Sequence, residues 1–106
     1  MRRHQRKVLA HPGSKSYNEL LTPNLQGLLE VLWSRVPSRT SGPVFQHEGE
    51  DFGLVLKGEL TCYVGEERYV LRAGDSITFK RTILHHYENA SRRPVEAIWV
   101  VTPPSI

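Results

Sequence analysis

The fold is decided by residues 47–60, which read HEGEDFGLVLKGEL. Apolar residues fill positions 52–56, and a second run begins at Leu60. Lys57-Gly58 separates the two runs, and glycine permits the backbone geometry that tight turns require. Two short strands joined by a turn are therefore predicted, with a polar segment leading into the first.

The same arrangement continues in both directions along the chain. Turn residues follow each short apolar segment, for example Gly65-Glu66 and Asn89-Ala90. The predicted strands cover residues 8–11, 17–21, 28–36, 52–56, 60–64, 68–71, 76–79, 85–88 and 95–101. Residues 25–33 come nearest to a helical period, but their β-branched and aromatic content favours a strand. Evenly spaced short strands are typical of a sandwich or barrel, so the predicted fold class is all-β.

Size and composition indicate one folded domain. The chain has 106 residues, of which 39% are hydrophobic and 24% charged, as in an ordinary globular domain, so a disordered chain is not expected. One cysteine allows no internal disulfide, which suits a reducing compartment. No apolar run approaches the roughly 20 residues that span a bilayer, and the first apolar run is too short for a signal peptide. We therefore expect a cytoplasmic protein that enters no membrane.

The positive charge is concentrated at the start of the sequence. Four of the fourteen Lys and Arg residues lie within the first seven positions, so ten basic residues accompany eleven acidic ones in the remainder. A DNA-binding domain carries its positive charge on a folded face. We therefore interpret residues 1–7 as a basic tail or linker, and we expect no DNA-binding surface in the rest of the chain.

Two predicted strands are apolar on both faces. Residues 52–56 and 97–101 lack the alternation that a strand with one solvent-facing side shows. A barrel of this size has little material to cover such strands twice, so their outer faces are expected to meet another subunit. A twofold homodimer is the simplest such assembly.

Candidate functional side chains lie where the chain enters the strand at residues 52–56. His47 and Asp51 are four positions apart, and His85 begins a later predicted strand. Side chains on neighbouring strands of a small barrel can converge in its interior. Two imidazoles and one carboxylate are the donor set of the facial triad that binds Fe(II) and similar ions.

These residues also fit two motifs of the cupin family. The first motif contains a glycine, histidines, an acid and a closing glycine; the second contains a glycine followed at fixed spacing by a histidine and an asparagine. The first is matched by Gly42, His47, Asp51 and Gly58, and the second by Gly74, His85 and Asn89. The chain thus resembles a cupin over nearly its whole length. The resemblance implies a small double-stranded β-helix, or jelly-roll, barrel, with residues 8–106 as the cupin domain.

Within this family, residues 47–60 and the ending at 99–106 are similar to one subgroup, the C-terminal sensory cupin of XRE-type helix-turn-helix transcriptional regulators. That resemblance implies a small-molecule effector domain that contacts DNA only through a helix-turn-helix domain elsewhere in a longer protein. The alternative is a mononuclear metal-dependent enzyme, an oxygenase, epoxidase or isomerase. A stand-alone binding or storage protein is the third interpretation.

The sequence departs from the family pattern at three positions. Phe45 replaces the first motif histidine, Asp51 replaces the usual glutamate, and Lys80 replaces a proline. Two interpretations of the site stay open. His47, Asp51 and His85 would hold one divalent ion (Fe, Zn, Ni or Mn), or they would form a hydrogen-bonded polar cluster in an organic-ligand pocket.

The predicted ligand pocket includes three aromatic side chains beside His47, Asp51 and His85. Tyr87 shares the strand face of His85, and Phe45 would supply an apolar wall. The residues predicted to contact the ligand are Phe45, His47, Asp51, His85, Tyr87 and Trp33.

Overall fold

The structure is a computed structural model that describes residues 1–10 and 13–104. In these residues one short 3-10 helix, η1 (Arg3–Gln5), precedes ten strands. The strands are β1 (Lys7–Leu9), β2 (Tyr17–Leu20), β3 (Glu30–Val36), β4 (Thr40–Ser41), β5 (Glu50–Lys57), β6 (Glu59–Val64), β7 (Glu67–Arg72), β8 (Ser76–Lys80), β9 (His85–Asn89) and β10 (Val95–Thr102). Among the described residues, no helix has the length and apolar character needed to cross a membrane.

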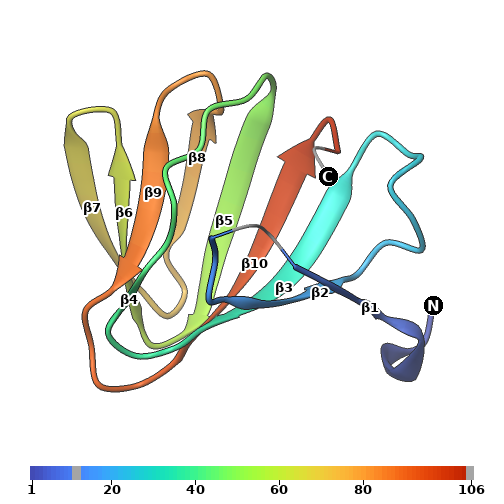
Figure 1. Ribbon diagram of the computed structural model, residues 1–106, viewed down its shortest axis with the longest axis horizontal. Coiled ribbons are helices and arrows are strands. Elements are labelled where there is room, and N and C mark those ends of the chain that lie inside the picture. Colours follow the sequence, from blue (N-terminus) through green and yellow to red (C-terminus); the bar gives the residue numbers. More distant parts are fainter. Residues whose placement is uncertain (11–12, 105–106) are drawn as a thin grey trace.

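The strands form two antiparallel sheets, which make up the two sides of the molecule in Figure 1. The larger sheet has the order β1-β2-β3-β10-β5-β8, and the smaller has the order β4-β9-β6-β7. The chain passes from one sheet to the other at Gly58, between β5 and β6. Gly58 has a φ of +87°, and a Cβ there would lie 2.9 Å from the carbonyl oxygen of Pro94, so this turn requires glycine. The all-β jelly-roll prediction is confirmed.

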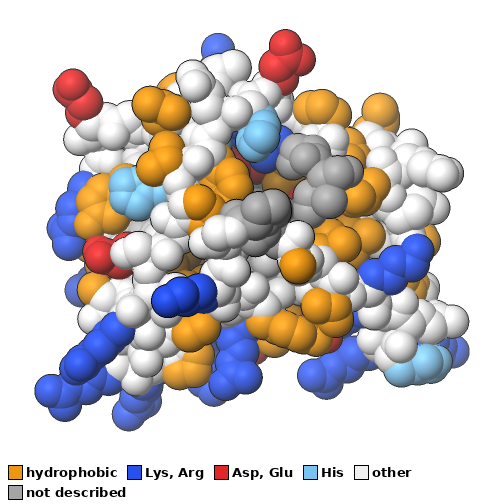
Figure 2. Space-filling view, viewed as in Figure 1, with side chains coloured by type: hydrophobic (Ala, Val, Ile, Leu, Met, Phe, Trp, Pro, Cys, Tyr) orange, Lys and Arg blue, Asp and Glu red, His pale blue; other side chains and the backbone are white. Residues whose placement is uncertain are grey.

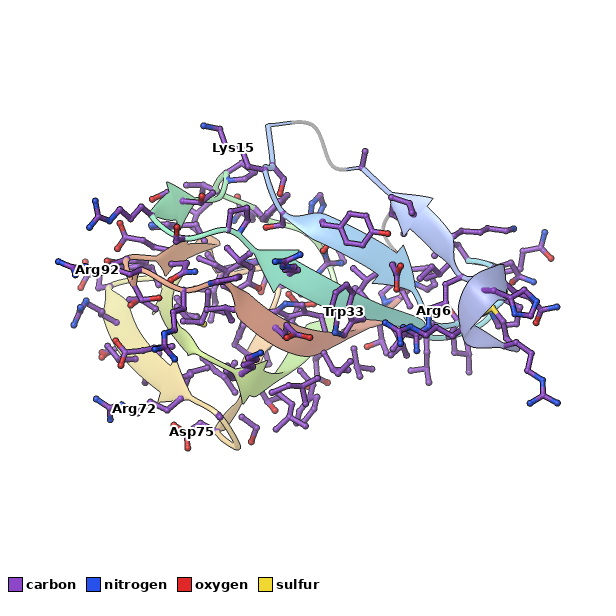
Figure 3. All side chains as sticks on the ribbon, turned by 90° about the horizontal axis from the view of Figure 1, so that it is seen from below. Arg6, Lys15, Trp33, Arg72, Asp75 and Arg92 are labelled. Atoms are coloured by element: carbon purple, nitrogen blue, oxygen red, sulfur yellow. The ribbon has the colours of Figure 1, made fainter. Side chains whose placement is uncertain are left out.

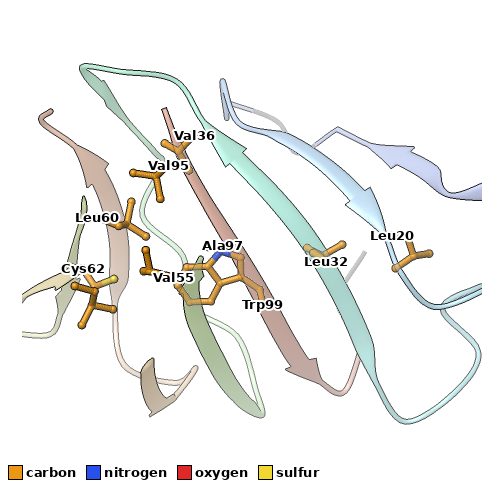
Figure 4. Packing of buried hydrophobic residues seen from close by; sticks show 10 residues of the cluster. Leu20, Leu32, Val36, Val55, Leu60, Cys62, Val95, Ala97 and Trp99 are labelled. Carbon is orange, nitrogen blue, oxygen red and sulfur yellow. The ribbon is translucent and has the colours of Figure 1, made fainter. Parts of the chain in front are cut away.

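The hydrophobic core fills the space between the two sheets, as the close view in Figure 4 shows. The buried members of the cluster are Leu20, Leu32, Val36, Val55, Leu60, Cys62, Leu71, Val95, Ala97 and Trp99. Along β10 every second residue is buried, as expected of a strand with one face toward the core. Burial also raises the pKa of the Cys62 thiol to about 12, which makes this thiol unreactive at neutral pH.

The indole of Trp99 lies against β5 at the one position where that strand has no side chain. A Cβ at Gly53 would lie 2.2 Å from Cζ3 of Trp99. Gly53 and Trp99 are paired in register across β5 and β10. The glycine therefore creates the space that the indole occupies.

The start of β3 differs from the prediction. The predicted strand covered residues 28–36, but β3 begins at Glu30. Glu30 pairs with Val101, near the end of β10, so a longer β3 would lack a partner on that side. Leu28, in the segment before β3, has 86% of its surface exposed. An apolar pattern predicts a strand only as far as a neighbouring strand exists to pair with it.

Candidate ligand-binding site

A cavity of about 120 Å³ lies between the two sheets. Its lining comes from β2, β3, β5, β9 and β10, with one residue of β6 and loop residues that precede β2, precede β5 and follow β8. The apolar part of the wall includes Leu32, Val36, Leu60, Trp99 and Val101. Figure 2 shows hydrophobic side chains in several places on one face of the molecule. The cavity thus combines an apolar wall with several polar and charged side chains.

Asp51 is the central polar residue of this cavity. It lies near the start of β5, in register with Val101 of β10 and Phe79 of β8. The burial of β5 alternates from Asp51 through Gly53 to Val55, so the carboxyl points to the inner face of the sheet. Its side chain is only 6% exposed.

His85 and Tyr87 reach the cavity from the opposite sheet. Both lie on β9, two residues apart and so on the same face. The backbone of His85 forms two hydrogen bonds with Phe45: the Phe45 N–H donates to the His85 carbonyl at 2.8 Å, and the His85 N–H donates to the Phe45 carbonyl at 3.0 Å. This bridge fixes Phe45 beside the imidazole, with the two ring centroids 6.0 Å apart.

Three side chains converge on the carboxyl of Asp51. The Nε of Arg81 lies 3.2 Å from its Oδ1 in a buried ion pair. The hydroxyl of Tyr87 donates a hydrogen bond to Oδ2 at 3.5 Å, and the Nε2 of His85 is 3.6 Å from the same oxygen. These four side chains, Asp51, Arg81, His85 and Tyr87, are called the polar cluster below.

The tautomer of His85 follows from its other ring nitrogen. Nδ1 lies 2.8 Å from the carbonyl oxygen of Ile83, and a carbonyl can only accept a hydrogen bond. Nδ1 therefore carries the proton, and in the neutral ring Nε2 is an acceptor. Two acceptors, Nε2 of His85 and Oδ2 of Asp51, then face each other. A hydrogen-bond donor placed beside them would satisfy both.

Burial dominates the protonation of the polar cluster. It raises the pKa of Asp51 from 3.8 to about 6, against the opposing effects of the Arg81 charge and the Tyr87 hydrogen bond, while Glu30 adds to the rise. Burial also lowers the pKa of His85 from its ordinary 6.5 and raises that of Tyr87 well above 10. At neutral pH the cluster therefore holds a carboxylate, an uncharged imidazole and an uncharged phenol.

The structure brings most of the predicted site residues together. Asp51, His85, Tyr87 and Phe45 all line the cavity. His47 lines it too but is exposed, with its ring centroid 6.2 Å from that of Phe45. Trp33 is not among the lining residues: it alternates with the inward-facing Leu32 and Ser34 of β3 and so lies on the outer face of the larger sheet.

Sequence reasoning missed two charged residues of the cavity, Arg81 and Glu30. Both are buried, Glu30 with 1% and Arg81 with 6% of its surface exposed. The alternation of buried and exposed positions along each strand could have identified both residues as buried. Glu30 is two positions before the core residue Leu32, and Arg81 is two positions after the buried Phe79. Asn18 and Ser34, which are hydrogen-bonded to each other in the same cavity, were also missed.

The predicted metal ligands do not form a three-ligand set in this arrangement. Among the residues that the structure describes, no group of three His, Cys, Asp or Glu side chains is placed to hold a metal ion. Arg81 is paired with the carboxyl of Asp51, and His47 is exposed at the rim. The side chains as placed do not fit such a site, and metal binding by His47, Asp51 and His85 stays a prediction.

Fold and cavity together define a β-barrel of the jelly-roll class with a cavity between its sheets. The sequence model of the Cupin domain matches residues 32–101, which is well over half of the chain. The chain therefore belongs to the cupin family, as its two motifs predicted.

Among curated proteins, the chain is similar to a helix-turn-helix regulator of Escherichia coli strain K12, the "HTH-type transcriptional regulator PuuR". The two are 34% identical over 67 residues, which are 63% of this chain and 36% of the regulator. The matched stretch is thus little more than a third of the regulator's length. The chain is accordingly similar to a helix-turn-helix regulator over part of that protein.

Solved structures confirm the fold. An RmlC-like cupin from Shewanella frigidimarina superposes with a TM-score of 0.80 at 20% identity, covering 97% of this chain and 88% of that one. The Cupin_2 domain of an XRE family transcriptional regulator from Enterobacter cloacae has a TM-score of 0.75 at 20% identity, covering 85% of this chain and 98% of that one. At these identities the likeness is one of fold.

Proposed function

We propose that this chain is the effector-binding cupin domain of a DNA-binding transcriptional regulator. The observation that supports this proposal most is the acceptor pair at the polar cluster. His85 Nε2 and Asp51 Oδ2 lie 3.6 Å apart in a cavity that also has an apolar wall with Leu32, Leu60 and Trp99. An apolar wall combined with hydrogen-bonding groups at fixed positions is typical of small-molecule sites.

The effector of this proposal is a small organic molecule with a hydrogen-bond donor at one end. A hydroxyl, amine or amide N–H would donate to Nε2 of His85 and to the carboxylate of Asp51. Its hydrocarbon part would pack on Leu32, Leu60 and Trp99. Burying that part stabilises the complex by about 25 cal/mol per Å² of apolar area, and the donor fixes the orientation.

A link from the cavity to the N-terminal residues supports the regulatory part of the proposal. Asn18 of β2 lines the cavity, and β2 pairs with β1 over the residue pair Leu9 and Asn18. An effector that touches Asn18 therefore acts on the strand pair that follows the basic tail. In a longer protein, an effector that binds one arrangement of this strand pair more tightly would shift a helix-turn-helix domain between DNA-binding states. A cytoplasmic location fits this function and stays a prediction.

The test uses Trp99 as a reporter inside the cavity. The chain has two tryptophans, so Trp33→Phe leaves Trp99 alone. A panel of small alcohols, amines, amides and carboxylic acids is titrated while Trp99 emission and the thermal midpoint are recorded. We expect at least one donor-bearing class to bind, and Asp51→Asn to weaken that binding about 10- to 100-fold, because a charged hydrogen-bond acceptor is lost.

The matched control is Glu48→Gln, which removes an exposed carboxyl close to Asp51 in the sequence. It should leave the affinity unchanged. The proposal is wrong if no compound of the panel alters Trp99 emission or the thermal midpoint, or if Asp51→Asn binds as tightly as the control.

The competing proposal is a metal-dependent enzyme that uses His47, Asp51 and His85 as ligands. The same preparations distinguish it, after loading with Zn(II) or Fe(II) and removal of excess metal. We expect less than one bound equivalent, because Arg81 already pairs with Asp51. One full equivalent that is lost in His85→Ala would favour the enzyme instead.

A further inference from the structure

We infer that two copies of this chain associate through the outer face of the six-stranded sheet, about a twofold axis that runs across the strands. The inference concerns a surface that the cavity does not use. It specifies which residues meet and in which orientation, and it stands independently of the proposed function.

On the three central strands β3, β10 and β5, two neighbouring rows of the outer face carry only apolar side chains. Register pairs place Trp33, Ile98 and Leu54 side by side on β3, β10 and β5. The adjacent row on the same strands is Val31, Val100 and Phe52. These six side chains are called the apolar patch below.

The apolar patch is open enough to receive a partner. Phe52 has 37% of its surface exposed, and its other members are half-buried within the sheet. Leu56 and Tyr17, on the same sheet, are 45% and 43% exposed. Figure 3 shows Trp33 projecting from β3. A contiguous apolar area on one sheet face is typical of an interaction surface.

Charged residues border the patch at both ends of the strands. The row before Trp33, Ile98 and Leu54 is formed by Arg35, Glu96 and Lys57. The row beyond Val31, Val100 and Phe52 is formed on β10, β5 and β8 by Thr102, Glu50 and Lys80. Lys57 and Glu50, near opposite ends of β5, are both exposed.

This pattern of charge selects one orientation of a second copy. A twofold axis parallel to the strands would place Lys57 opposite the partner's Arg35, and Glu96 opposite the partner's Glu96. Both contacts join like charges. An axis across the strands keeps β5 over β5 with its direction reversed, so Lys57 meets the partner's Glu50. Symmetry repeats that attractive contact, and the two apolar patches coincide.

The same complementarity favours a second copy over an unrelated partner. Lys57 near one end of β5 and Glu50 near the other carry opposite charges, so two copies of the same surface can attract each other. Such self-complementarity is the condition for an isologous interface. Face-to-face packing of two such sheets is a common aligned arrangement in β proteins. A further domain of a longer protein would need no self-complementarity at this face.

Charge reversal and light scattering test the inference. The wild-type chain at about 100 μM should have twice its own mass of 12.1 kDa. Lys57→Glu and Glu50→Lys should each raise the dimer dissociation constant about 10-fold or more, because two attractive contacts become repulsive. The double variant should restore the wild-type value. An equimolar mixture of the two single variants should form a heterodimer, since both of its contacts are again attractive.

The control is Arg92→Glu, a charge reversal at the periphery of the molecule (Figure 3), which should leave the dimer intact. Circular dichroism checks that every variant is folded. A wild-type mass of 12.1 kDa would overturn the inference. A dimer that neither single reversal weakens, or two disruptive reversals that do not rescue each other when mixed, would overturn the proposed orientation.

Discussion

Asp51 lies between Arg81, which stabilises its charged form, and an apolar cavity, which destabilises it. The result is a pKa of about 6, well above the ordinary 3.8. The hydroxyl of Tyr87 donates a hydrogen bond to Oδ2 of Asp51 at 3.5 Å, and the Nε2 of His85 lies 3.6 Å from the same oxygen. Asp51 is therefore placed to accept a hydrogen bond from a ligand group such as a hydroxyl or an amide N–H.

The raised pKa of Asp51 predicts how stability depends on pH. The folded state binds the proton more tightly than the unfolded state does, so the contribution of Asp51 is complete below about pH 4 and is lost as the pH rises through about 6. A shift of about two pKa units corresponds to roughly 2–3 kcal/mol.

Urea unfolding of the wild type and of Asp51→Asn at pH 4, 5.5 and 7 measures this effect. Asparagine does not titrate, so we expect the stability of the variant relative to the wild type to rise by roughly 2–3 kcal/mol over this range. Glu48→Gln, at an exposed position, should show no such trend. Parallel pH profiles for the wild type and Asp51→Asn would contradict the assignment.

Residue by residue, the site could be predicted only where a motif or a strand face marked it. His85 and Asp51 were predicted by the family motifs, and Tyr87 by its spacing from His85. Arg81 was missed because a charged residue just after a strand usually faces solvent. Trp33 was placed in the pocket because it is aromatic, although alternation with Leu32 puts it on the outer face.

At the scale of strands, apolar runs bounded by glycine turns were predicted well. β5, β6 and β10 correspond closely to their predicted ranges, extended by one or two residues at some ends. β4 was not predicted, because two residues carry no periodic pattern and this strand exists only through its pairing with β9. The start of β3 was wrong for the same reason, since pairing, and not composition, ends a strand.

The contact between β5 and β10 at Gly53 supports a prediction about packing. Gly53→Ala would place a methyl group 2.2 Å from the Trp99 ring, so the indole has to move. We expect a loss of about 1–3 kcal/mol in the free energy of unfolding, together with a shift in Trp99 emission. Gly27→Ala is the matched control, because a Cβ there meets nothing within 4 Å. Equal stabilities of the two variants would show that the indole does not occupy this position.

At the scale of the whole molecule, the six-stranded sheet separates two roles by face. Its inner face lines the cavity with Asp51 and Trp99, and its outer face presents the apolar patch. Successive residues of β10 belong alternately to these two faces. This explains why β10 is apolar on both faces. It is also why the sequence predicts a subunit contact without indicating which surface forms it.

The distribution of charge over the molecule predicts weak, unselective DNA binding by this chain alone. The basic residues of positions 1–7 are Arg2, Arg3, Arg6 and Lys7, and Arg6 is partly neutralised by Glu19 at 3.2 Å. Four cations can release at most about four counterions, so the logarithm of the binding constant should fall with the logarithm of salt concentration at a slope no steeper than about −4.

Fluorescence anisotropy with two duplexes of unrelated sequence measures that slope. We expect equal affinities for both duplexes and loss of binding by about 0.2 M salt, because base-specific contacts belong to a recognition element and not to a short basic segment. Selective binding that persists at that salt concentration would place a DNA-reading surface within these 106 residues and would contradict the division of roles proposed for the regulator.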